Sequence, residues 1–170
     1  MLRVNVGYLL KQPPGYSREM EVDSGRLRIA DDLGLEFLRG TIRFTRTHEG
    51  LLAQGRLRTE VACECVRCLT DFALPLTASI QDLFYYPPDR AVDSDLVIPE
   101  DGNLDLGPLL REDIFLRTPM HAVCRPDCAG LCPVCGQNLN EGRCSCSEET
   151  GDPRWAALNS LLQTTVDSRQ

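Results

Sequence analysis

The cysteines are the residues of this chain whose type and spacing best suit a chemical task. Six of the nine fall within the 23 residues from 124 to 146. They are Cys124, Cys128, Cys132, Cys135, Cys144 and Cys146. Two thiolates at the spacing of Cys132-Pro133-Val134-Cys135 converge on one metal ion, and Gly136 permits the tight turn that follows. The spacing therefore predicts a small zinc module, whose closed four-thiolate site stabilises a fold and performs no reaction.

A tetrahedral zinc ion takes four ligands, so six cysteines leave more than one ligand set open. The favoured set joins a C-x-x-C pair to a later pair across a hairpin at residues 137–142. This set is Cys132, Cys135, Cys144 and Cys146. In the competing sets, Cys128 or Cys124 replaces one of the last two cysteines.

A second C-x-x-C pair, Cys65 and Cys68, stands much earlier in the chain. Joined by Cys124 and Cys128 it would complete a second metal site, which would use eight of the nine cysteines and leave Cys63 as a core residue. The structural alternative is simpler, because a cysteine on a strand is usually a small, buried apolar side chain. Spacing alone leaves both interpretations open.

The residues argue against an enzyme. His48 falls in a predicted turn and His121 lies beside the cysteine cluster, and neither accompanies a nucleophile motif or a glycine-rich phosphate loop. Cys65 and Cys68 are predicted to lie between two strands, whereas a thioredoxin-type redox pair opens a helix. We therefore expect no catalytic residue and no small-molecule substrate.

Length and composition predict a soluble protein with one core and an appendage. The chain has 170 residues, of which 42% are hydrophobic and 25% charged, and no apolar run approaches the roughly 20 residues that span a bilayer. The N-terminus lacks the features of a signal peptide. We expect a cytoplasmic protein without a membrane partner. In a reducing compartment, clustered cysteines are metal ligands more often than disulfides.

The net charge of −7 is unevenly distributed along the chain. Residues 1–70 carry 11 basic and 9 acidic side chains, whereas residues 71–170 carry 7 and 16. All basic residues except Lys11 are arginines, whose planar guanidinium groups suit phosphate, although such a bias also follows from genome composition. The first part of the chain is therefore the more plausible surface for a polyanion, and the second part for a basic partner.

Alternating apolar residues predict that most of the chain is antiparallel sheet. The clearest alternation runs over residues 56–84, with Arg56 and Arg58 on the polar side, and predicts a long hairpin whose tip is Cys65-Val66-Arg67-Cys68. Shorter alternating runs before it predict further strands. The predicted fold class is α+β, with a mainly antiparallel, barrel-like core of meander and hairpin strands, a small C-terminal cysteine-rich zinc module and a terminal helix.

Residues 1–118 are predicted to form the core. It includes an acidic loop over residues 87–103 with one short strand at 96–98, and a helix over about residues 105–117 that Asp105 caps. Residues 119–150 are predicted to form the zinc module. Asp152-Pro153 then begins a helix over residues 151–165, whose apolar stripe is expected to dock on the core.

Several strings of residues, taken together, identify a resemblance. They are Cys63-Glu64-Cys65-Val66-Arg67-Cys68-Leu69, then Gly130-Leu131-Cys132-Pro133-Val134-Cys135-Gly136-Gln137-Asn138-Leu139-Asn140, then Cys144-x-Cys146, and finally Asp152-Pro153-Arg154. In this order and at these separations, the chain resembles the large ribosomal RNA subunit accumulation protein family, the YceD-like proteins, over about residues 1–165. The resemblance implies a non-enzymatic role in ribosome biogenesis, in the accumulation or processing of 23S-type rRNA.

Two hypotheses follow from the resemblance and the charge distribution. In the first, the chain binds large-subunit rRNA or a pre-ribosomal particle, with Arg56, Arg58 and Arg67 in contact with phosphates. In the second, its acidic part is a scaffold or chaperone for a basic ribosomal protein, and the effect on rRNA is indirect. The first hypothesis predicts that association with RNA depends on salt concentration.

Overall fold

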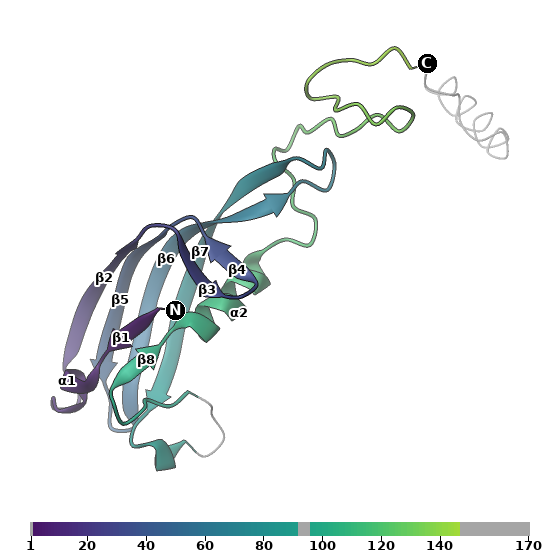
Figure 1. Ribbon diagram of the computed structural model, residues 1–170. Coiled ribbons are helices and arrows are strands. Elements are labelled where there is room, and N and C mark those ends of the chain that lie inside the picture. Colours follow the sequence, from purple (N-terminus) through teal and green to yellow (C-terminus); the bar gives the residue numbers. More distant parts are fainter. Residues whose placement is uncertain (1, 92–95, 147–170) are drawn as a thin grey trace, which may run out of the picture. The chain divides into compact units, whose positions relative to one another are not determined.

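The computed structural model describes residues 2–91 and 96–146 of the chain (Figure 1). It divides into two compact units, residues 1–128 and residues 129–170, which are taken in turn below. Cys124 and Cys128 belong to the first unit, although the sequence predicts them within the zinc module. The predicted terminal helix over residues 151–165 lies outside the described residues.

The largest element of the first unit is a four-stranded antiparallel sheet. Its strands are β2 (Ser17–Ser24), β5 (Leu38–Arg46), β6 (Gly50–Glu64) and β7 (Asp71–Tyr85), in the order β2-β5-β6-β7. The predicted hairpin is confirmed, because β6 and β7 pair without a break from Gly50 opposite Tyr85 to Glu64 opposite Asp71. Side chains alternate between the two faces of a sheet, so this register assigns every residue of the hairpin to a face.

One face of the sheet packs against short elements. These are β1 (Arg3–Asn5) paired with β8 (Asn103–Asp105), β3 (Leu27–Ala30) paired with β4 (Leu33–Leu35), and the helices α1 (Gly7–Leu10) and α2 (Gly107–Arg117). A 3-10 turn, η1 (Pro88–Arg90), follows β7. Ile42, Phe44 and Leu57 of the sheet are fully buried in one core with Leu110 and Ile114 of α2. Figure 1 shows α2 and the β1–β8 pair on the same side of the sheet.

The predicted barrel-like core is wrong. Within the described residues the four-stranded sheet is open, since β2 and β7 each have only one neighbouring strand. A sheet closes into a barrel when its own strands must cover its apolar face, but here α2 and the short strand pairs cover that face. The other face carries four exposed arginines, Arg39, Arg43, Arg56 and Arg58.

The helix that the sequence predicts begins two residues later than expected and ends at the expected residue. Asp105 belongs to β8, yet its Oδ1 accepts a hydrogen bond of 2.9 Å from the backbone N–H of Gly107, the first residue of α2. The strand predicted at residues 96–98 is a single parallel bridge between Val97 and Tyr85. No helix among the described residues has both the length and the apolar character needed to span a membrane.

Candidate functional site

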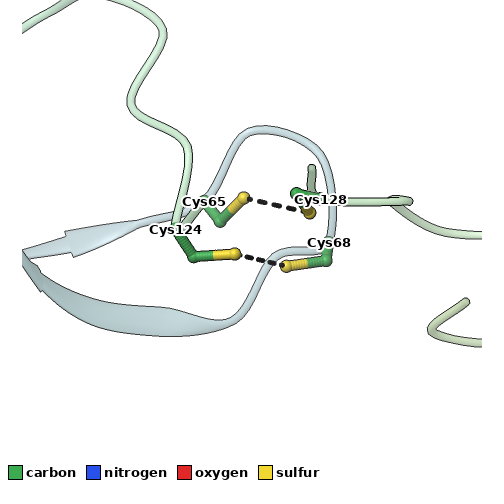
Figure 2. A group of neighbouring side chains, drawn as sticks. All are labelled: Cys65, Cys68, Cys124 and Cys128. Atoms are coloured by element: carbon green, nitrogen blue, oxygen red, sulfur yellow. Dashed lines mark hydrogen bonds between the residues drawn. The ribbon is translucent and has the colours of Figure 1, made fainter. Parts of the chain in front are cut away.

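The tip of the long hairpin brings four sulfur atoms together in the first unit. Cys65 and Cys68 lie in the turn between β6 and β7, and Cys124 and Cys128 lie in the segment after α2. Their side chains point toward a common centre (Figure 2). The distance between the Sγ atoms is 3.8 Å for Cys65 and Cys128, and 3.8 Å for Cys68 and Cys124. We name these four residues the first sulfur site.

The distances in the first sulfur site suit a tetrahedral metal ion. With Zn–S bonds of about 2.3 Å, neighbouring sulfurs of the tetrahedron lie about 3.8 Å apart, whereas a disulfide holds them at about 2.05 Å. All four sulfurs lie within 4.8 Å of one another, and Cys65, Cys68 and Cys128 are buried. Such a set could hold one metal ion, and thiolates suit zinc or an iron centre.

The backbone of the hairpin tip is folded to turn both of its thiols inward. The N–H of Leu69 donates to the carbonyl of Cys65 at 2.8 Å, and the N–H of Cys65 donates to the carbonyl of Thr70 at 3.0 Å. This tight turn forces Leu69 to a φ of 55°, the left-handed region that side chains other than glycine rarely adopt.

Two hydrogen bonds fasten the segment after α2 to this tip. The N–H of Val66 donates to the carbonyl of Ala122 at 2.9 Å, and the guanidinium of Arg67 donates to the carbonyl of Cys128 at 3.1 Å. The structure therefore places Arg67, a predicted RNA contact, against the first sulfur site. The segment that carries Cys124 and Cys128 is therefore joined to the hairpin tip by these two hydrogen bonds as well as by the contacts between the sulfurs.

The second unit contains the second sulfur site, which consists of Cys132, Cys135, Cys144 and Cys146. Their sulfurs also lie within 4.8 Å of one another. The N–H of Val134 points at the Cys132 sulfur over 3.4 Å, and a bridge between Leu131 and Asn138 closes the loop around the pair. These are the four cysteines that the spacing favours, so the structure brings the favoured set together.

The two sulfur sites share one turn geometry. In the second site the N–H of Gly136 donates to the carbonyl of Cys132 at 2.9 Å, and the N–H of Cys132 donates to the carbonyl of Gln137 at 2.8 Å. The same two bonds, at the same spacing, form in the hairpin tip. Gly136 has a φ of 73° where Leu69 has 55°. The sequence hides this equivalence, because leucine at Leu69 gives no signal of a left-handed turn.

The thiols of the first sulfur site differ in acidity before a metal binds. Burial would raise the pKa of Cys65, but backbone N–H groups of Cys124, Cys68 and Arg67 lower that pKa to about 6. Burial, together with the neighbouring sulfurs of Cys128, Cys65 and Cys68, raises the pKa of Cys124 to about 12. Cys65 is therefore the more acidic of these two thiols, and Cys124 is the one that holds its proton more tightly.

Metal affinity of the first sulfur site is expected to rise with pH. Zinc binds thiolates, so Cys124 must release its proton when the ion enters. Each released proton makes the affinity about tenfold tighter per pH unit between about pH 7 and 8. Calorimetric titration with zinc in buffers of different ionisation enthalpy measures the protons released. An affinity that does not change over this range would contradict the assignment of Cys124 as a ligand.

A second candidate site is the accessible face of the sheet. The register puts Arg39 and Arg43 of β5 on this face with Arg56 and Arg58 of β6, and we name it the arginine face. Arg39 pairs with Asp23 at 2.8 Å, and Arg43 pairs with Glu19 at 2.5 Å. Among the described residues, Arg56 and Arg58 have no ion-pair partner.

The arrangement of the unpaired arginines favours an anion. Arg58 stands directly opposite Arg39 across the β5–β6 ladder, where like charges repel, and Asp23 offsets this repulsion through its ion pair with Arg39. In the register Arg56 stands between Thr41 and Ser79, and the Ser79 hydroxyl already accepts a hydrogen bond from Arg117. Two exposed arginines without an ion-pair partner among the described residues leave positive charge on this face, which suits an anionic ligand.

A polar hollow of about 690 Å³ lies in the arginine face. Its lining includes Arg43 and Arg56 of the sheet and Arg117 from the end of α2, with Gln54 and Ser79 between them. Arg117 donates to the Ser79 hydroxyl at 2.6 Å and pairs with Asp113 at 2.6 Å. Sequence reasoning finds Arg56 and Arg58 but misses Arg39, Arg43 and Arg117, because only the strand register and the docking of α2 bring these residues to the same face.

Comparisons with known proteins place this chain in a family. The family model described as "Large ribosomal RNA subunit accumulation protein YceD" matches residues 53–162. Uncharacterized protein Rv2926c of Mycobacterium tuberculosis is 34% identical over 132 residues, which cover 75% of this chain and 63% of that protein. Uncharacterized protein YlbN of Bacillus subtilis is 32% identical over 111 residues, which cover 64% of each chain.

A plant relative carries the family's description in its name. Large ribosomal RNA subunit accumulation protein YCED homolog 1, chloroplastic, of Arabidopsis thaliana is 33% identical over 65 residues, which cover 38% of this chain and 20% of that protein. This chain thus spans less than two thirds of the mycobacterial and plant relatives it matches. No solved structure matches it. The family match takes in both sulfur sites, Arg56 and Arg58, and it shows that the chain belongs to the YceD family of large ribosomal RNA subunit accumulation proteins.

Proposed function

We propose that this chain binds 23S-type rRNA of the large subunit, or a pre-ribosomal particle that contains it, and thereby supports accumulation of that RNA without catalysing a reaction. The observation that carries the proposal is the arginine face, on which Arg56 and Arg58 lie without an ion-pair partner among the described residues. The name of the matching family and the names of its chloroplast members support the choice of large-subunit rRNA.

The chemistry of the arginine face suits the RNA backbone. A guanidinium offers a planar fork of donors that matches phosphate oxygens, and such contacts position RNA without reading its sequence. Arg56 and Arg58 are two residues apart on one strand, so their side chains leave the same face roughly 6.8 Å apart along β6. Arg39 and Arg43 lie on the neighbouring strand and are ion-paired with Asp23 and Glu19. Each of these two guanidinium groups can release its carboxylate partner and bind a phosphate instead.

We further propose that both sulfur sites hold zinc and that the metal stabilises the fold. Each set consists of cysteine sulfurs alone, and a closed set of four thiolates leaves no open position for a substrate or water. In the first unit the ion would join the segment after α2 to the tip of the hairpin. In the second unit, where the described residues include no helix and no strand longer than a bridge, it would supply most of the folding free energy.

Depletion of the protein in its own organism is expected to lower the ratio of large-subunit to small-subunit rRNA. Wild-type protein should restore this ratio, and an Arg56→Gln/Arg58→Gln variant should not. The matched control is Arg26→Gln/Arg111→Gln, which removes the same charge from two ion pairs that lie outside the arginine face. Electrophoresis of total RNA measures the ratio. Full restoration by Arg56→Gln/Arg58→Gln at equal protein level would contradict the proposal.

A further inference from the structure

A groove of about 860 Å³ opens on the side of the sheet that α2 covers, away from the arginine face. It lies beside β7 and β8 and the first turns of α2. Its apolar lining consists of Phe84, Leu96, Val97, Pro99, Leu104, Pro108 and Leu109. Its charged lining consists of Asp82, Asp101, Asp105, Glu112 and Arg3. We name it the acid-rimmed groove, because four carboxylates stand there against one guanidinium.

Asp82 is the residue of this groove that packing does not explain. In the register of β7 it shares the core face with Ile80 and Phe84, both of which are 2% exposed. Alternation predicts an apolar residue at this position, because a carboxylate beside a core loses hydration. Asp82 is instead partly exposed, and it lines the groove. Asp82 is thus a carboxylate among apolar residues of the core face, and it lies where that face opens into the groove. This position indicates a binding role.

The other carboxylates are only partly neutralised by the chain itself. Asp105 and Arg3 form a long ion pair, with 3.8 Å between the guanidinium nitrogen and the carboxylate oxygen. Asp101 accepts hydrogen bonds from the backbone and side-chain amides of Asn103. The Glu112 carboxylate makes no hydrogen bond and no ion pair among the described residues, although the charge of the neighbouring Arg111 acts on it. The rim therefore keeps a net negative potential.

These features select among ligand classes. A phosphate backbone would meet four carboxylates and be repelled. A single cation needs oxygen ligands that converge, and among the described residues the only groups of three or more candidate ligands that converge closely enough are the two cysteine sets. An extended peptide that alternates basic with apolar residues would place apolar side chains on the floor and ammonium or guanidinium groups against the rim.

We propose that the acid-rimmed groove binds a basic, extended segment of a partner protein. The inference goes beyond RNA binding and does not rest on it, because Asp82 and Arg56 lie on opposite faces of the same sheet. RNA on the arginine face and a basic protein segment in the groove do not compete for the same residues. The chain has the surfaces to hold both at once.

The test is the affinity of a short fluorescent peptide in which Arg and Lys alternate with Val and Leu, followed by fluorescence anisotropy. The Asp82→Asn/Glu112→Gln variant is expected to bind it roughly tenfold more weakly than the wild-type chain. Raising the salt concentration should weaken wild-type binding, because the rim contacts are exposed. Neither substitution removes a residue of a sulfur site or of the arginine face, so RNA binding should be unchanged.

Two controls make the result decisive. Glu21→Gln/Asp71→Asn makes the same charge change at exposed positions outside the groove and should bind the peptide as wild type does. A peptide with Glu in place of Arg and Lys should not bind. The proposal is overturned if Asp82→Asn/Glu112→Gln, shown to be folded by circular dichroism, keeps wild-type affinity, or if the control variant loses as much.

Discussion

Replacement of Cys128 by serine is expected to reduce the zinc content from two ions per chain to one and to destabilise the first unit. A metal present at about 1,000 times its dissociation constant stabilises the folded state by about 4 kcal/mol, and loss of the site removes that contribution. For a unit of this size the loss corresponds to a fall in Tm of roughly 10 °C or more. Atomic absorption measures the metal, and calorimetry measures the unfolding.

The expected size of this effect follows from where Cys128 lies. The Cys128 side chain is buried, and its sulfur lies 3.8 Å from that of Cys65. The Cys128 carbonyl accepts a hydrogen bond from the guanidinium of Arg67. A serine hydroxyl is shorter, and it is a poor ligand for zinc beside three thiolates. Without the ion, only hydrogen bonds such as that from Val66 to Ala122 hold the segment after α2 to the hairpin tip.

Cys63→Ser is the matched control for Cys128→Ser. Cys63 is a partly buried cysteine on β6 that belongs to neither sulfur site, and burial raises the pKa of its thiol. Its replacement should leave two zinc ions per chain and change stability by no more than about 1 kcal/mol. Two zinc ions in Cys128→Ser, or an equal loss of metal in Cys63→Ser, would show that the first sulfur site is wrongly assigned.

The second large effect is expected on RNA binding. At about 50 mM salt, Arg56→Gln/Arg58→Gln should bind a single-stranded fragment of large-subunit rRNA on the order of fiftyfold more weakly than wild type. Loss of two phosphate contacts should also reduce the slope of log K against log salt by about 1.4, since each contact with a single strand contributes roughly 0.7. Filter binding across a series of salt concentrations gives both quantities.

Arg26→Gln/Arg111→Gln should keep both the wild-type affinity and the wild-type slope. Both arginines form exposed ion pairs, with Glu36 and Asp32, and exposed pairs contribute little to stability. If this control lost as much affinity as Arg56→Gln/Arg58→Gln, the binding would depend on net charge and not on the arginine face.

Much of the fold could be predicted because alternation of apolar residues is a local signal. The hairpin of β6 and β7 and the helix α2 follow directly from periods of two and of about 3.6 residues. Whether a sheet closes is not local. It depends on what covers the apolar face, and the strands that do so here together with α2, namely β1, β3, β4 and β8, are three or four residues long. Such short runs carry too little periodicity to predict the layer they form, which is why the barrel-like prediction was wrong.

The candidate sites also divide into those that local sequence predicts and those that depend on the tertiary structure. Cysteine spacing within a few residues predicts each C-x-x-C turn, and the set Cys132, Cys135, Cys144 and Cys146 is contiguous enough to favour from sequence. The union of Cys65 and Cys68 with Cys124 and Cys128 spans half the residues of the first unit, and spacing can only raise it as an alternative. The arginine face depends on the pairing register of β5 with β6, and the acid-rimmed groove on the docking of α2. Neither surface can be predicted from a single stretch of sequence, because each is formed by residues from separate elements.

Crosslinking in living cells tests the central claim, direct binding of large-subunit rRNA, most directly. Ultraviolet light joins protein to RNA only at contact distance, and sequencing of the RNA that survives denaturing purification identifies the contacts. The wild-type chain is expected to give a localised peak in large-subunit rRNA that Arg56→Gln/Arg58→Gln loses and Arg26→Gln/Arg111→Gln keeps. A background-level signal from the wild-type chain, with ribosomal proteins still co-purifying under native conditions, would contradict direct binding and leave the protein scaffold as the explanation.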